Sequence, residues 1–92
     1  MNYVKILIYL NPDEATELEA AYGYIPLDLC KKKDLLISKH PSAIYYGSDK
    51  NKDGSYSNCS IFYIDGVSFQ SPLTVEQILS ICSKLTQSLI QN

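Results

Sequence analysis

The chain has 92 residues, enough for one domain with one modest hydrophobic core, and residues 1–92 are treated as a single domain. Ten acidic and eight basic residues give a net charge of −2, which excludes a general electrostatic attraction to nucleic acid or to anionic membranes. All eight basic residues are lysine, so the chain lacks the guanidinium groups that usually recognise phosphate and guanine, which argues against nucleic-acid binding.

Composition also bears on the source and the compartment. The chain is rich in lysine, isoleucine, tyrosine and asparagine, a usage typical of AT-rich coding sequence and so of a phage, a mobile element or a low-GC bacterium. The apolar run from Val4 to Leu10 is shorter than the roughly 20 residues of a membrane span, and no signal-peptide pattern surrounds it. The three cysteines, Cys30, Cys59 and Cys82, form no C-x-x-C pair and fit reduced, mostly buried thiols. We therefore expect a cytoplasmic protein without a membrane partner.

The first segment, residues 3–10, predicts a strand because apolar side chains recur at every second position. The apolar face, which is expected to point to the core, carries Val4, Ile6, Ile8 and Leu10. The opposite, mixed face carries Tyr3, Lys5, Leu7 and Tyr9.

The next segment, residues 11–23, predicts a short surface helix. Asn11 can cap its start, Pro12 suits its first turn, and Gly23 can end it in the left-handed conformation. Its apolar stripe is thin, so most of the helix is expected to face water. The acidic side of this helix carries Asp13, Glu14, Glu17 and Glu19.

Residues 24–40 allow two interpretations. They can form a short strand, a loop and a second strand that ends before His40, or they can contain a helix near residues 28–37. We favour extended structure from Leu35 to Ser38, because "KHPS" predicts a turn into the next strand. The three lysines at residues 31–33 are interpreted as a solvated loop.

From residue 43 the pattern predicts an antiparallel meander. Residues 43–48 read as a strand, residues 49–54 as a loop and residues 59–64 as a second strand. Asp65 and Gly66 are a favoured two-residue hairpin turn, after which residues 67–69 return as a third strand.

The last segment predicts an amphipathic helix. Thr74 and Gln77 form the T-x-x-Q pattern of a capping box, and Leu73 and Ile78 are placed for the hydrophobic staple that accompanies it. The expected fold is an α+β two-layer sandwich: an antiparallel sheet of four or five strands, a short N-terminal helix and a longer C-terminal helix. The apolar stripe of that longer helix consists of Val75, Ile78, Leu79, Cys82, Leu85 and Leu89.

The stretch "DKNKDGSYSNCS", residues 49–60, resembles the EF-hand calcium loop over nine residues. Asp49, Asn51 and Asp53 occupy its first, third and fifth positions, and a glycine occupies the sixth. The bidentate glutamate of the EF-hand is replaced by Ser60, and two lysines inside the loop offset its two carboxylates. We therefore expect a polar turn without a metal and keep a calcium-binding domain as an alternative.

The sequence offers no arrangement typical of catalysis. The one histidine, His40, directly precedes Pro41 in a predicted turn, and neither a G-x-S-x-G motif nor a glycine-rich phosphate loop occurs. We expect that the protein is not an enzyme and needs no cofactor.

Tyrosine is the unusual residue, with eight in the chain. If Phe62 and Ile64 face the helices, the alternation of the strand turns Tyr63 away from them, together with Ile61 and Cys59. Either Tyr45 or Tyr46 must join that side. An aromatic sheet face that no helix covers is typical of a protein interface, because tyrosine joins a large apolar ring to a polar tip.

The sequence therefore predicts a small non-catalytic protein-binding domain, of the adaptor or inhibitor type, as an accessory protein of a phage or mobile element would be. It would dock on another protein through its tyrosines, its acidic helix or both. The alternative is a homo-oligomeric structural domain in which the same face closes a dimer. The expected contact residues are Tyr3, Lys5, Tyr9, Tyr45, Tyr63, Glu14 and Glu17.

Overall fold

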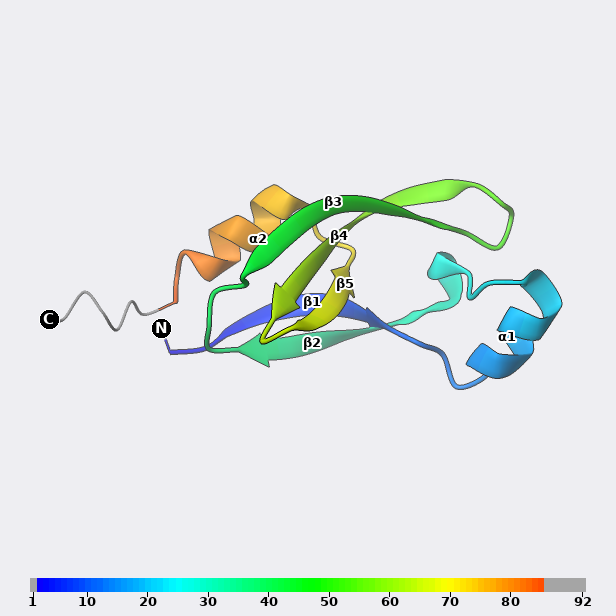
Figure 1. The fold of residues 1–92 in the computed structure, drawn as a ribbon, viewed down its shortest axis with the longest axis horizontal. Coiled ribbons are helices and arrows are strands. Elements are labelled where there is room, and N and C mark those ends of the chain that lie inside the picture. The colour runs from blue at the N-terminus through cyan, green and yellow to red at the C-terminus, as the bar shows by residue number, and fades with distance from the viewer. Residues whose placement is uncertain (1, 86–92) are drawn as a thin grey trace, which may run out of the picture.

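The fold joins two antiparallel sheets and two helices in a small α+β arrangement (Figure 1). The structure is a computed structural model, and it describes residues 2–85. A two-stranded sheet comes from the first part of the chain and a three-stranded sheet from the second. In chain order the elements are β1 (Val4–Leu10), α1 (Ala15–Tyr22), the short 3₁₀ turn η1 (Leu27–Leu29), β2 (Lys31–Ile37), β3 (Ala43–Lys50), β4 (Tyr56–Ile64), β5 (Val67–Ser71) and α2 (Val75–Cys82).

The five strands do not form the single sheet of four or five strands expected from the sequence. β1 pairs with β2, and β3, β4 and β5 form a separate antiparallel meander. β1 and β5 lie next to each other, but no backbone ladder joins them. The hydroxyl of Ser71 donates instead to the backbone carbonyl of Leu7 at 2.5 Å. At this point a side chain of β5, rather than its backbone, bonds to β1.

β2 resolves the ambiguous segment, and it corrects two interpretations. Residues 31–33 belong to the strand rather than to a loop, and no helix forms over residues 28–37 apart from the η1 turn. The strand holds because Lys31 lies opposite Leu10 of β1 and Ile37 lies opposite Val4, so the ladder runs the whole length of β1. The lysine side chains stay in water, and Lys31 forms an ion pair with Asp13 at 2.7 Å.

α1 is the surface helix that the sequence predicts, since none of its residues is buried. Its start is different from the expected one: the N-cap is Glu14, no side chain caps it, and Pro12 lies before the helix and accepts a hydrogen bond from Ala15. Its end is as expected, with Gly23 at φ +81° and the Gly23 N–H bonded to the Glu19 carbonyl at 2.8 Å.

α2 begins with the predicted capping box. The Thr74 hydroxyl accepts from the Gln77 N–H at 3.0 Å, and the Gln77 side chain accepts from the Thr74 N–H at 2.8 Å. The helix ends at Cys82 and has eight residues, the same length as α1, so within the described residues the C-terminal helix is not the longer of the two. Leu89 lies outside the described residues. Leu79, expected in the apolar stripe, is 54% exposed because it lies at the edge of the stripe that buries Ile78 and Cys82. No helix in the described part is long and apolar enough to cross a membrane.

The meander follows the prediction closely. Asp65 and Gly66 have φ of +52° and +80°, as a two-residue turn with both central residues left-handed requires. β3 continues through Asp49 to Lys50, so the first two residues of the expected loop belong to the strand and pair with β4.

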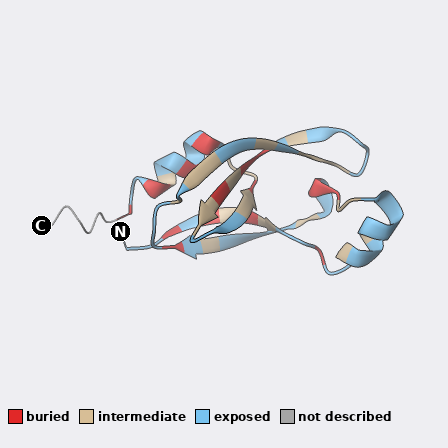
Figure 2. Ribbon diagram, viewed as in Figure 1, coloured by how far each residue is buried: buried red, intermediate tan, exposed pale blue. Residues whose placement is uncertain are grey.

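The core lies where β1, β4 and α2 meet, and Figure 2 shows buried positions on all three elements. Phe62 is fully buried at its centre and stacks on Phe69 of β5, with ring centroids 5.4 Å apart. Because α2 and the apolar face of β1 both pack on the Phe62 side of the three-stranded sheet, the opposite side stays largely open. The buried cluster consists of Val4, Ile6, Ile8, Ile37, Phe62, Ile78, Cys82 and Leu85.

Candidate functional site

A depression of about 730 Å³ lies between the end of β1 and the side of the three-stranded sheet that faces away from Phe62. Tyr9 of β1, Asp49 of β3, Ile61 of β4 and Gln70 of β5 line it, so four strands contribute. We call this depression, with these four residues, the tyrosine trough. Its volume falls within the range of about 300–1,000 Å³ that is usual for ligand sites.

Two further tyrosines extend the trough along the sheet. Ile61 lies directly opposite Tyr45 on one neighbouring strand and opposite Gln70 on the other. Tyr45 in turn contacts Tyr63 edge-to-face, with ring centroids 5.9 Å apart and planes at 89°. Tyr45 is 54% exposed and Tyr63 is half-buried. Tyr45 and Tyr63 therefore lie on the same side of the sheet as Ile61, next to the depression that Tyr9 lines.

Tyr46 lies on the opposite side of β3, which settles which of the two adjacent tyrosines joins the trough. It lies opposite Ser60 in the ladder, on the side of Phe62, and its hydroxyl donates to the carboxylate of Glu76 at the start of α2. This hydrogen bond raises the pKa of the Tyr46 phenol and lowers the pKa of Glu76. Tyr46 thus links α2 to the three-stranded sheet, whereas Tyr45 lies on the open side of that sheet.

Gly47 of β3 leaves room for the side chains of Ile61 and Cys59 on the neighbouring strand. A Cβ atom added at Gly47 would lie 3.1 Å from Cδ1 of Ile61 and 3.5 Å from the sulfur of Cys59. The missing side chain lets both residues lean across the strand. Cys59 is buried for this reason although it lies on the trough side, and all three cysteines are free thiols, as expected.

Two titratable groups near the end of β1, the Tyr9 phenol and the Cys30 thiol, have a raised pKa. Burial, and then the neighbouring Cys59 and Cys30 thiols, raise the pKa of the Tyr9 phenol above its ordinary value. Burial, and then the carboxylates of Asp49 and Asp28, raise the pKa of the Cys30 thiol. Tyr9 is therefore a hydrogen-bond donor near neutral pH, and Cys30 is a poor nucleophile.

Asp49 is the one charged residue among those that line the trough. Its carboxylate accepts from the Gln70 amide at 3.1 Å and from the Lys50 backbone N–H at 2.8 Å. The same Gln70 nitrogen lies 3.2 Å from the sulfur of Cys59, so both of its hydrogens have acceptors. Among the described residues, Asp49 forms no ion pair.

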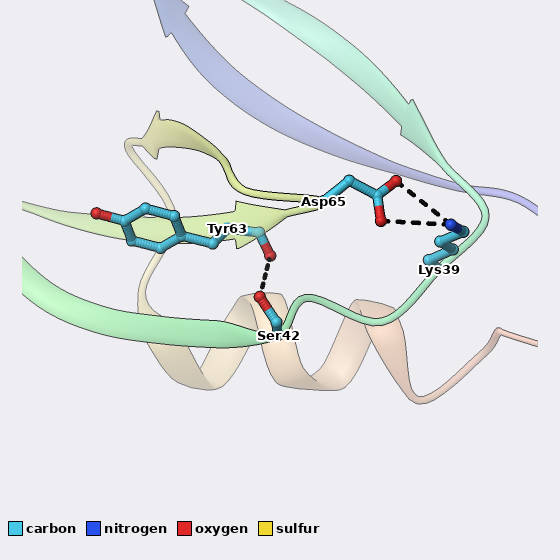
Figure 3. A network of polar contacts seen from close by, with 4 residues as sticks. All are labelled: Lys39, Ser42, Tyr63 and Asp65. Atoms are coloured by element: carbon cyan, nitrogen blue, oxygen red, sulfur yellow. Dashed lines mark hydrogen bonds and ion pairs between the residues drawn. The ribbon is translucent and has the colours of Figure 1, made fainter.

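The backbone of Tyr63 is fixed by the connection between β2 and β3 (Figure 3). Its carbonyl accepts from the Ser42 N–H at 2.9 Å and lies 3.4 Å from the Ser42 hydroxyl. Lys39, in the same connection, pairs with Asp65 at 3.3 Å, and the Tyr63 ring extends away from these contacts. Since both charged side chains are about two-thirds exposed, the hydrogen bonds to the backbone contribute more to the position of Tyr63 than the ion pair does.

The EF-hand-like loop forms a turn whose polar groups bond to one another. Asp53 accepts from the Ser55 N–H at 2.9 Å and from the Ser55 hydroxyl at 2.6 Å, and these bonds lower the pKa of Asp53. Asn51 donates to the Ser57 hydroxyl at 2.8 Å, while Asp49 points to Gln70. Across the described residues no group of three or more His, Cys, Asp or Glu side chains is placed to hold a metal ion.

We predict that millimolar calcium produces no saturable heat in isothermal titration. The two carboxylates of the loop already accept hydrogen bonds from different partners, and two lysines flank Asn51. A saturable isotherm that Asp53→Asn abolishes would contradict this prediction and establish the loop as a calcium site.

The remaining expected contact residues lie elsewhere. Tyr3 and Lys5 border a separate depression of about 360 Å³ at the start of β1, beside Leu36 of β2. Glu14 precedes α1 and Glu17 lies on it, both exposed and neither in the trough. The structure therefore places Tyr45 and Tyr63 in contact with each other and Tyr9 in the adjoining trough, and it leaves the other four residues apart from them.

Sequence reasoning missed three residues that border these depressions. Gln70 was placed in no element, because the returning strand was expected to end at residue 69. Leu36 is 62% exposed, as Tyr3 is, and lies opposite Lys5 in the ladder. Alternation across residues 35–37 was a signal for Leu36 in an outward position. Asp49 was considered only as a calcium ligand.

No known protein family, curated protein or solved structure matches this chain. Proposals about its function therefore rest on the geometry of the trough and on the chemistry of the residues around it.

Proposed function

We propose that this chain is a small, non-catalytic, cytoplasmic domain that binds another protein through the tyrosine trough, in the manner of an adaptor or inhibitor. An accessory role in a phage or mobile element fits its composition. The observation that carries the proposal is that Tyr45 and Tyr63 lie on the open side of the three-stranded sheet beside Ile61, which lines the same depression as Tyr9.

The physical argument is that these rings are available but held in place. Tyr45 and Tyr63 pack against each other, so little side-chain freedom remains to be lost when a partner docks. Tyr9 is positioned by burial and by Lys32, whose ammonium lies 5.9 Å from its ring centroid. Rigid aromatic rings with polar tips are the side chains that most often dominate the binding energy of protein interfaces.

We predict that Tyr9→Ala and Tyr45→Ala each lower the recovery of a stoichiometric partner about tenfold in a tagged capture from host lysate, as loss of a hot-spot side chain does. Tyr56→Ala is the matched control, because Tyr56 is 66% exposed and lies outside the trough. Far-UV circular dichroism of each variant checks that the fold is retained.

Two other results would change the conclusion. If Tyr56→Ala weakens capture as strongly as Tyr45→Ala, the trough is not the binding site. If the purified chain has twice its 10.3 kDa mass by light scattering, and Tyr45→Ala makes it monomeric, the trough closes a homodimer instead.

A further inference from the structure

We propose that the tyrosine trough receives a basic side chain, lysine or arginine, from the partner protein, and that Asp49 takes its charge. This inference rests on the proposed function, since it specifies the chemistry of the partner segment that docks there.

The first argument is the charge of the trough. Of the residues in the described part of the chain, Asp49 is the only charged one that lines it, and its two hydrogen bonds come from neutral donors, the Gln70 amide and a backbone N–H. A carboxylate offers about four lone-pair positions, so acceptor capacity remains after these two bonds. A cationic donor forms a stronger hydrogen bond with such a group than a neutral donor does.

The second argument is that Asp49 is held ready for a ligand. Gln70 donates to Asp49 and to Cys59 through the same amide nitrogen, which fixes the amide plane and with it the carboxylate. Asp49 itself is half-buried in the strand, so its charge is screened less than that of a surface aspartate. Gln70 is in this sense a positioning residue.

The third argument is the shape of the walls. Leu10, Ile61 and Phe69 give the trough apolar surface beside its polar residues, and Asp49 gives it one charged point. A lysine or arginine side chain has the complementary form, with an aliphatic stem that packs on apolar surface and a charged head. An acidic side chain would meet the negative charge of Asp49 in the same space and would be rejected.

The lysines nearby do not occupy this position. Lys32 lies over the Tyr9 ring, and Lys50 lies over the Tyr24 ring at 5.0 Å from its centroid. Neither lines the trough. The preference for a basic side chain is therefore expected to be local to Asp49.

The test is a selection of random peptides displayed on phage against the folded, full-length chain, followed by fluorescence anisotropy with the selected peptides. We expect the selected peptides to share a lysine or arginine flanked by apolar residues. Replacing that residue by glutamine or citrulline should weaken binding to the natural chain about tenfold, as removal of one charge-assisted hydrogen bond does.

Asp49→Asn should weaken binding of the original peptide by a similar factor. On the Asp49→Asn variant, replacing the basic residue of the peptide should not weaken binding any further, because that residue and Asp49 act as a pair. Asp13→Asn, an exposed aspartate outside the trough, is the matched control and should leave binding unchanged. The peptide substitutions are read on the natural chain, so the test stands even if Asp49→Asn fails to fold.

The outcomes separate this inference from the proposed function. Selected peptides that need Tyr9 and Tyr45, but carry no basic residue or are insensitive to Asp49→Asn, overturn the inference and leave the proposed function standing. Peptides whose binding is unchanged by Tyr9→Ala and Tyr45→Ala overturn both. A selection that yields no binder to the folded chain also counts against both.

Discussion

Replacing Phe62 with alanine is expected to lower the free energy of unfolding by about 3–5 kcal/mol, the usual cost of removing a large aromatic side chain from a core. The Phe62 side chain is fully buried, and its ring stacks on the ring of Phe69. Phe62 lies among buried residues from β1, β2 and α2. The alanine variant would therefore lose packing contacts between both sheets and the helix. Urea denaturation followed by circular dichroism measures this change.

The size of this effect matters because small domains are marginally stable, with a free energy of unfolding of about 5–15 kcal/mol. Phe62→Leu, which keeps most of the apolar volume, should cost less and remain folded if Phe62→Ala does not. Tyr56→Ala, an exposed aromatic residue of the same strand, should change the stability by no more than about 0.5 kcal/mol. A loss below about 1 kcal/mol for Phe62→Ala would show that Phe62 is not the centre of the core.

Replacing Ser71 with alanine is expected to cost about 1–3 kcal/mol, because it removes a hydrogen bond and leaves a backbone carbonyl unsatisfied beside a buried position. The Ser71 hydroxyl is completely buried, donates to the Leu7 carbonyl and accepts from the Leu73 N–H at 3.1 Å. It therefore joins β1, β5 and the segment that leads into α2.

The natural comparison is Ser68→Ala in the same strand, where the side chain is exposed and the stability should change by at most about 0.5 kcal/mol. Thermal unfolding of both variants measures the difference, and about 1 kcal/mol corresponds to roughly 4–8 °C in a domain of this size. Equal melting temperatures for Ser68→Ala and Ser71→Ala would show that the two sheets do not depend on this contact.

Elements that depend on nearby residues were predictable. The capping box of Thr74 and Gln77 forms because both partners lie within one helical turn, and packing elsewhere does not alter them. The turn at Asp65 and Gly66 forms for the same reason, since both residues tolerate a positive φ. The left-handed end of α1 at Gly23 belongs to the same group.

Elements that depend on residues far away in the chain were not predictable from the sequence. The lysines of β2 have weak strand propensity, and their strand exists because β1 supplies a complete ladder for it. The strands divide into two sheets, and where the sheets meet the Ser71 hydroxyl donates to a carbonyl 64 residues away in the chain. No local pattern contains that information.

The candidate site shows the same division. The sequence by itself determined that Tyr9, Tyr63 and one of the tyrosines at positions 45 and 46 lie on strand faces turned from the core, because alternation along a strand is a local property. Only the tertiary structure decided that Tyr45 joins Tyr63, that β1 ends beside β5, and that Gln70 holds Asp49 at the same depression. These contacts require the register between strands and the placement of one sheet against the other, which packing of the whole core sets.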